Sequence, residues 1–140
     1  MPEEGTHKMT ERTETALRET LHELMRAGVS VDLEALDQIY HNDLQILMLT
    51  DDGALMSTDK AGCLALLKET FRGKTPEDHM WAKIHAVSVS GDRGHVLISR
   101  KIPIGGPEML IDLSIDLIHQ DGRWQVIREV NFSRPATAAA

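Results

Sequence analysis

The chain has 140 residues with a net charge of −7, 41% hydrophobic and 26% charged residues, which suits one globular domain. No cluster of lysine and arginine interrupts this acidic balance, which argues against a nucleic-acid partner and against an anionic membrane surface. No apolar run approaches the roughly 20 residues of a transmembrane helix, and the single cysteine, Cys63, excludes an intrachain disulfide. The polar N-terminus resembles neither a signal peptide nor a transit peptide, so we expect a cytoplasmic protein.

Two helices are predicted at the start of the chain. From Thr10 to about Ala27, apolar residues recur every three or four positions, which predicts an amphipathic helix that ends near Gly28. Asp32 is a preferred N-cap residue and predicts the start of a second, shorter helix that extends to Tyr40.

A short hairpin and a third helix follow. Residues 44–50 and 54–57 are predicted strands, and the sequence Asp51-Asp52-Gly53 between them is a turn. Thr58 or Asp59 then begins a helix over residues 60–71, whose apolar residues share one face.

Four strands complete the chain, over residues 80–90, 95–102, 109–120 and 123–132. Successive strands with short connections form an antiparallel meander. The predicted order is therefore ααββαββββ, an α+β domain in which three helices pack on one face of a curved antiparallel sheet. We expect residues 1–8 and 135–140 to be disordered, which leaves residues 9–134 as a single domain.

Three segments resemble the nuclear transport factor 2-like superfamily, and within it the small bacterial SnoaL-like (polyketide-cyclase-like) domains. They are Arg26–Asp43, Ser57–Phe71 and Asp121–Ser133, which are similar to the family's helix pair, third helix and closing strand. The resemblance covers about residues 10–133 and implies a cone-shaped fold with a pocket between sheet and helices. It also implies a homodimer formed through the other face of the sheet. The fold alone assigns no activity, because it hosts enzymes, binding modules and assembly domains alike.

The polar side of the strand 109–120 supplies the first candidate site residues, Asp112, Ser114 and Asp116. In one interpretation they line the pocket, and Asp116 is similar in position to an acid that donates to an oxyanion in ketosteroid isomerase-like members. A carboxylic acid in an apolar pocket has a raised pKa and can donate a hydrogen bond. In the other interpretation this side faces solvent or a wet dimer interface. The general base of those isomerases would lie at about residues 47–50, where this chain has no carboxylate.

Arg100 is the next candidate, because it is the one charge on the otherwise apolar side of the strand 95–102. It would pair with Asp116 or bind an anionic ligand, and otherwise it is structural. Its segment resembles the Arg-x-Asp strand of limonene-epoxide-hydrolase-like members, but Ile102 stands where they carry the aspartate. Glu129 lies near that family's second aspartate, whereas the alternation of the last strand places it on the opposite face from Val130.

Three further side chains are candidate ligand contacts. His85 could enter a pocket as acid, base or donor, and Tyr40 and Trp81 could stack on a ligand. The plainer alternatives are a surface histidine and aromatic residues that fill the core. No histidines have the spacing of a metal site, and no glycine-rich phosphate loop occurs, so we expect neither a metal nor a cofactor.

Two functions fit these observations. In the first, a polar cluster of Arg100, Asp112 and Asp116 lies in an apolar pocket that binds a small organic ligand. The protein is then either a binding protein or an enzyme that acts on this ligand. In the second, the chain is a non-catalytic homodimerisation or protein-interaction module, in which the apolar side of the strand 109–120 is a dimer seam. The two functions differ in whether the polar side of that strand is enclosed or wet.

Overall fold

A computed structural model describes residues 11–73, 80–103 and 108–136. The predicted lead, residues 1–8, lies outside the described residues, as do residues 137–140 of the predicted tail. Within the described part of the chain, helices and strands follow in the predicted order: α2 (Glu14–Ser30), α3 (Leu33–Ile39), β1 (Tyr40–Leu49), β2 (Leu55–Thr58), α4 (Lys60–Thr70), β3 (Ala82–Ser90), β4 (Arg93–Ile102), β5 (Met109–Gln120) and β6 (Arg123–Pro135).

Side-chain caps set where the helices begin. Thr13, Asp32 and Asp59 each accept a hydrogen bond from a backbone N–H in the first turn of α2, α3 and α4. The end of α2 differs from the prediction, because the helix continues past Gly28. It continues to Ser30, and the C-cap residue Val31 adopts a left-handed conformation with a φ of 52°.

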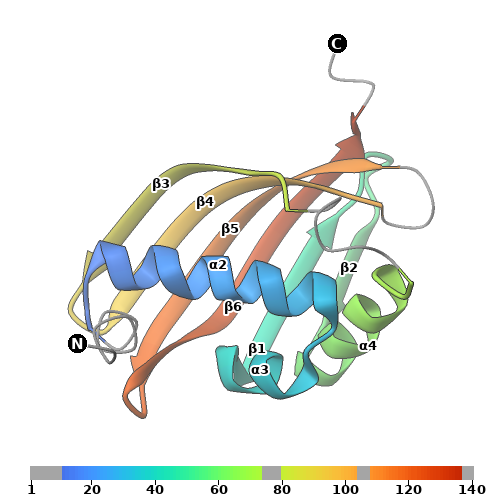
Figure 1. Ribbon diagram of the computed structural model, residues 1–140. Helices are drawn as coiled ribbons and strands as arrows, with labels where there is room; N and C mark the ends of the chain where they lie inside the picture. Colours follow the sequence, from blue (N-terminus) through green and yellow to red (C-terminus); the bar gives the residue numbers. More distant parts are fainter. Residues whose placement is uncertain (1–10, 74–79, 104–107, 137–140) are drawn as a thin grey trace.

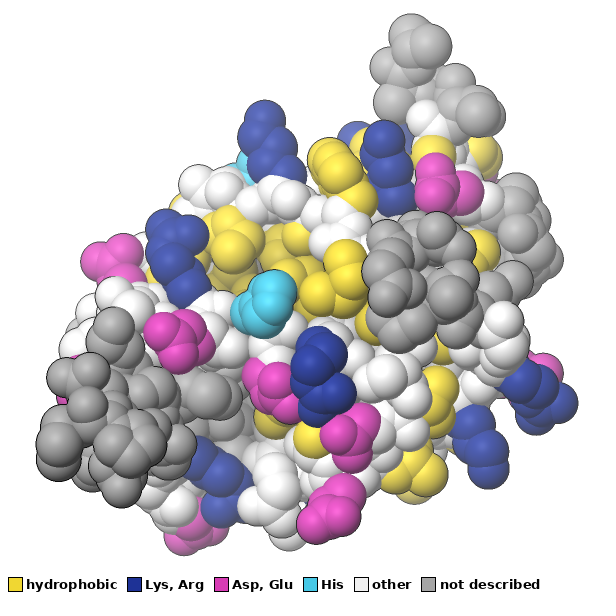
Figure 2. All heavy atoms as spheres, viewed as in Figure 1, with side chains coloured by type: hydrophobic (Ala, Val, Ile, Leu, Met, Phe, Trp, Pro, Cys, Tyr) yellow, Lys and Arg dark blue, Asp and Glu magenta, His cyan; other side chains and the backbone are white. Residues whose placement is uncertain are grey.

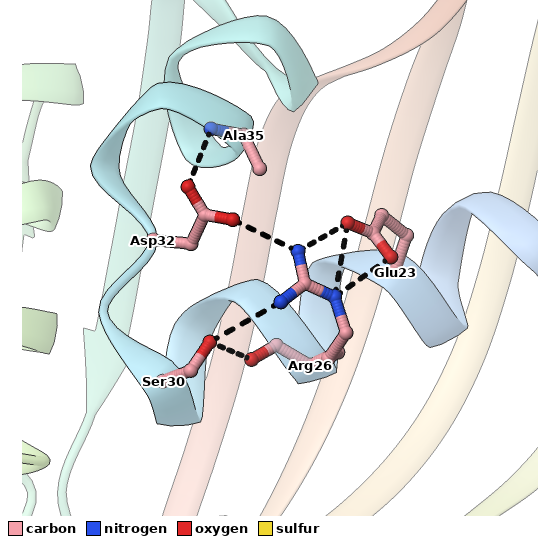
Figure 3. A network of polar contacts seen from close by, with 5 residues as sticks. All are labelled: Glu23, Arg26, Ser30, Asp32 and Ala35. Carbon is pink, nitrogen blue, oxygen red and sulfur yellow. Dashed lines mark hydrogen bonds and ion pairs between the residues drawn. The ribbon is translucent and has the colours of Figure 1, made fainter.

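A network of polar contacts joins the end of α2 to the start of α3 (Figure 3). Arg26 binds Glu23 on its own helix, and its Nη2 lies 3.0 Å from Oδ2 of Asp32. The guanidinium lowers the pKa of both carboxyls. Asp32 also accepts from the backbone N–H of Ala35, so one carboxylate both caps α3 and fixes the turn before it.

The strands form one curved sheet in the order β2-β1-β6-β5-β4-β3 (Figure 1). The predicted antiparallel meander is confirmed for β3 to β6. However, β1 pairs in parallel with β6, so the sheet is mixed rather than wholly antiparallel. A parallel pair needs a long crossover connection, and β2, α4 and the strands β3 to β5 supply it.

A bulge in β6 changes which of its residues face the helices. Val126 and Arg128 pair with consecutive residues of β5, which leaves Ile127 between them as an extra residue. Because side chains alternate along a strand, one extra residue moves all later ones to the other face. Glu129 therefore faces the same side of the sheet as Val126, whereas Val130 faces the opposite side.

The helices cover one face of the sheet, here named the inner face, and the opposite side is the outer face (Figure 1). α2 approaches β4 closely, since a Cβ on Gly94 would lie 2.8 Å from Cδ2 of Leu17. Trp124 fills the space beside this contact and donates through Nε1 to the backbone oxygen of Glu11. None of the helices that the structure describes is long and apolar enough to cross a membrane.

Candidate functional site

A hollow of about 110 Å³ lies between the inner face and the helices α2 and α4. Most of its wall is apolar. Leu66 of α4 lines it and is 38% exposed, so the hollow reaches the surface beside α4. Figure 2 shows further hydrophobic side chains at the surface between α2 and the sheet. The apolar lining includes Leu21, Leu24, Met25, Ile46, Met48, Leu67, Phe71, Ile98, Ile102, Ile111, Leu113 and Ile115.

Two ionisable groups of opposite charge, Arg100 and Glu129, lie in this apolar wall. Glu129 is 6% exposed and stands in β6 between Ile46 of β1 and Ile115 of β5. Arg100 stands in β4 opposite Ile111, and its Nε atom is buried. Within the described part of the chain, the hollow thus combines one cation and one carboxyl group with an apolar lining.

Burial raises the pKa of Glu129 to about 7, because apolar surroundings disfavour the charged carboxylate. The nearby Arg100 cation and a hydrogen bond from Tyr40 act in the opposite direction without cancelling this effect. Burial also lowers the pKa of Arg100, but a guanidinium remains charged at neutral pH. Near neutral pH, the protonated and the ionised forms of Glu129 are therefore both populated, so this carboxyl can donate or accept a proton.

Tyr40 and Cys63 are the remaining titratable groups among the described residues that line the hollow. Both are buried and hydrogen-bonded to each other. Burial raises the pKa of Tyr40 well above its usual value and raises the pKa of Cys63 to about 12. Tyr40 is therefore a neutral hydroxyl at physiological pH, and Cys63 is a protonated thiol that makes a poor nucleophile.

The polar side of β5 does not line this hollow. The interpretation in which Asp112, Ser114 and Asp116 line the pocket is therefore wrong. These residues lie on the outer face, because the apolar side of β5 packs in the core beneath the helices. Arg100 and Asp116 lie on opposite faces and cannot pair. The apolar side of β5 includes the buried Ile115, so it belongs to the core and does not form a dimer seam.

Several predicted ligand contacts meet instead in a groove on the outer face. His85 Nε2 lies 2.8 Å from the Ser99 hydroxyl, which donates to Asp112 at 2.5 Å. Arg134 binds the other oxygen of Asp112 at 2.7 Å, and Ser99 and Arg134 together lower the pKa of that carboxyl. Trp81 lines the same groove and is exposed, with the Lys101 ammonium 4.8 Å from its ring centre. The polar groups of this groove are therefore largely bonded to one another.

The alternation of apolar residues in the last strand predicts the wrong face for Glu129, which lines the hollow. Counting every second residue from Trp124 puts Val130 in the core and Glu129 outside, because the count ignores the bulge. One sequence signal was available: Val126 and Ile127 are consecutive apolar residues that interrupt the alternation. Among the residues that the structure describes, no group of three His, Cys, Asp or Glu side chains is arranged to hold a metal ion.

Comparison with known proteins supports the fold and leaves the activity open. The model of the family described as "Putative lumazine-binding" matches residues 12–131. The chain is similar to an NTF2-like protein of unknown function from Silicibacter pomeroyi, with 23% identity, a TM-score of 0.67 and coverage of 86% of this chain and 92% of that one. It is also similar to an NTF2-like protein from Cytophaga hutchinsonii, with 17% identity, a TM-score of 0.68 and coverage of 89% and 100%. None of the curated proteins matches the chain. The predicted nuclear transport factor 2-like fold is thereby confirmed.

Proposed function

The chain belongs to the family described as "Putative lumazine-binding", and from this premise we propose that the hollow binds a small organic ligand. The observation that carries the proposal is an apolar hollow that contains Arg100, Glu129 and Tyr40. Ligand sites commonly combine an apolar lining with a few polar groups that orient the ligand. An engineered cavity of about 150 Å³ admits benzene, so a volume of about 110 Å³ suits a ligand near the size of one ring. A two-ring heterocycle such as lumazine would extend toward the open side at Leu66.

The chemistry that Glu129 could supply to a ligand in this hollow is proton transfer. Glu129 has a pKa of about 7, which suits a general acid or base at neutral pH. Cys63 is held as the thiol and is no candidate for covalent catalysis. We propose ligand binding as the function and Glu129, in place of Asp116, as the group that would act on a bound molecule.

Methyl NMR of methionine-labelled protein tests ligand binding in the hollow. Met25 and Met48 line the hollow, whereas Met56 is exposed on the edge strand β2. Single-ring compounds should shift the Met25 and Met48 signals and leave that of Met56 unchanged. The control variant Leu113→Phe should abolish these shifts, because it adds a ring to the wall of the hollow. Ring compounds that shift only Met56, or none of the three signals, would contradict the proposal.

We also propose that the outer face mediates homodimerisation. Leu97 and Phe132 expose 41% and 47% of their surface there, on the central part of the sheet. Charges of both signs, including Asp112 and Arg134, surround them, and two-fold pairing can bring opposite charges of two copies together. Light scattering should report a dimer that the variant Phe132→Glu dissociates, whereas Met56→Glu on β2 should leave it intact. A monomeric wild type at high concentration would refute this second proposal.

A further inference from the structure

We propose that the hollow prefers small monoanions with an apolar body, such as monocarboxylates, and that Glu129 takes up a proton when such an anion binds beside Arg100. This inference rests on the proposed function, because it assigns a chemical class to the ligand of the same hollow. It follows from the charges in the wall, taken one element at a time.

Among the described residues that line the hollow, Glu129 is the group whose protonation sets the net charge near neutral pH. α2 and β5 contribute apolar side chains, α4 contributes Cys63, β1 contributes Tyr40 and β4 contributes Arg100. Tyr40 and Cys63 remain neutral because burial raises the pKa of each group, and Arg100 remains positive. From β6, the neighbour of Glu129 along the wall is the uncharged amide Asn131. The described part of the lining therefore has a net charge of zero when Glu129 is ionised and of +1 when it is protonated.

A bound carboxylate would compete with Glu129 for the same cation. Two carboxylates in one apolar site do not both remain ionised at low cost, so one of them takes a proton. An ordinary carboxylic acid has a pKa of about 4, whereas the pKa of Glu129 is about 7. The proton therefore goes to Glu129, and the ligand keeps its charge and accepts hydrogen bonds from Arg100.

The coupled step is a proton binding equilibrium. A solvent proton adds to a carboxylate oxygen of Glu129 as the ligand anion enters, and no covalent bond between protein and ligand forms. Below about pH 7, Glu129 already holds this proton and the anion binds without further uptake. Above that pH, each unit of pH should weaken anion binding by up to about tenfold.

Calorimetric titration with benzoate and with its neutral isostere benzamide tests the inference. From about pH 6 to about pH 8, the Kd for benzoate should rise about tenfold, and binding at the higher pH should take up about one proton. The proton count follows from repeating the titration in buffers of different ionisation enthalpy. Benzamide carries no charge, so its binding should show no proton uptake.

Two variants separate the roles of the two ionisable residues. Glu129→Gln cannot titrate, so its Kd for benzoate should be the same at both pH values. Arg100→Met should lose benzoate binding and keep benzamide binding. If Arg100→Met does not fold, Arg100→Lys replaces it and should keep the preference for benzoate over benzamide, because it keeps the positive charge.

The outcomes distinguish this inference from the proposal on which it rests. If benzamide shifts the Met25 and Met48 signals but benzoate does not, the anion preference is wrong and ligand binding in the hollow stands. The same holds if benzoate binds with no dependence on pH. If neither probe shifts these signals at saturating concentration, both proposals are wrong.

Discussion

Replacing Glu129 by glutamine should remove a pH-dependent loss of stability. The carboxyl has a pKa of about 7 in the folded protein, compared with an ordinary value of 4.5. At low pH it is protonated in both the folded and the unfolded state and costs nothing. As the pH rises from 4.5 through 7, the unfolded state loses its proton first, so the folded state becomes less stable. At about 1.4 kcal/mol per pKa unit, the rise from 4.5 to about 7 gives a total loss of about 3 to 4 kcal/mol.

Urea unfolding of the wild type and Glu129→Gln over a range of pH measures this effect. The stability of the variant relative to the wild type should increase by about 2 to 3 kcal/mol between about pH 5 and about pH 8. Ile98→Val is the control, because it alters the same wall without a titratable group. It should lower stability by about 1 kcal/mol at every pH.

A constant difference in stability between Glu129→Gln and the wild type over this range would show that the pKa of Glu129 is not raised by folding. The variant could also become less stable relative to the wild type as the pH rises, which would contradict the prediction as well. The second result would mean that the attraction between Arg100 and ionised Glu129 exceeds the cost of burying the carboxylate.

Three further predictions concern the elements that build the hollow. Gly94→Ala should lower the free energy of unfolding by about 1 to 3 kcal/mol in urea, because the added Cβ would lie 2.8 Å from Cδ2 of Leu17. An unchanged urea midpoint would show that α2 can move away from β4. Thr13→Ala should lower the free energy of unfolding by about 1 kcal/mol through loss of the N-cap of α2, whereas Thr13→Ser should lower it much less. Equal losses of stability in the two variants would show that the cap contributes little. Cys63 should resist thiol reagents in the folded protein at neutral pH, because it is buried and its pKa is about 12; labelling faster than unfolding would contradict this environment.

Local signals in the sequence predicted the elements of the fold well. Asp32 and Asp59 cap helices where their residue types indicate, and the period of two in residues 109–120 identifies β5. The parallel pairing of β1 with β6 was not predicted, because it joins strands at opposite ends of the chain and no local pattern encodes it. The extension of α2 beyond Gly28 was missed because a glycine can remain inside a helix when its backbone hydrogen bonds continue.

The candidate site was only partly predictable for a related reason. Arg100 was identified as a charge on an apolar strand side, and Tyr40 as an aromatic ligand contact, and both line the hollow. For Asp116 the sequence leaves two interpretations open, the pocket and a wet outer side, because position along a strand does not determine which face the helices cover. Glu129 was placed outside because one extra residue, Ile127, reverses the alternation between Val126 and Glu129.

The central proposal for this protein is that the hollow beneath α2 and α4 holds a ligand beside Arg100. A crystal structure of the protein with 4-bromobenzoate tests this directly, because the anomalous signal of bromine locates the molecule independently of the protein. We expect a bromine peak inside the hollow. The carboxylate of the ligand should bind Arg100, and Glu129 should lie in the same wall. A bromine peak only in the outer-face groove beside Trp81, or no peak at saturating concentration, would contradict it.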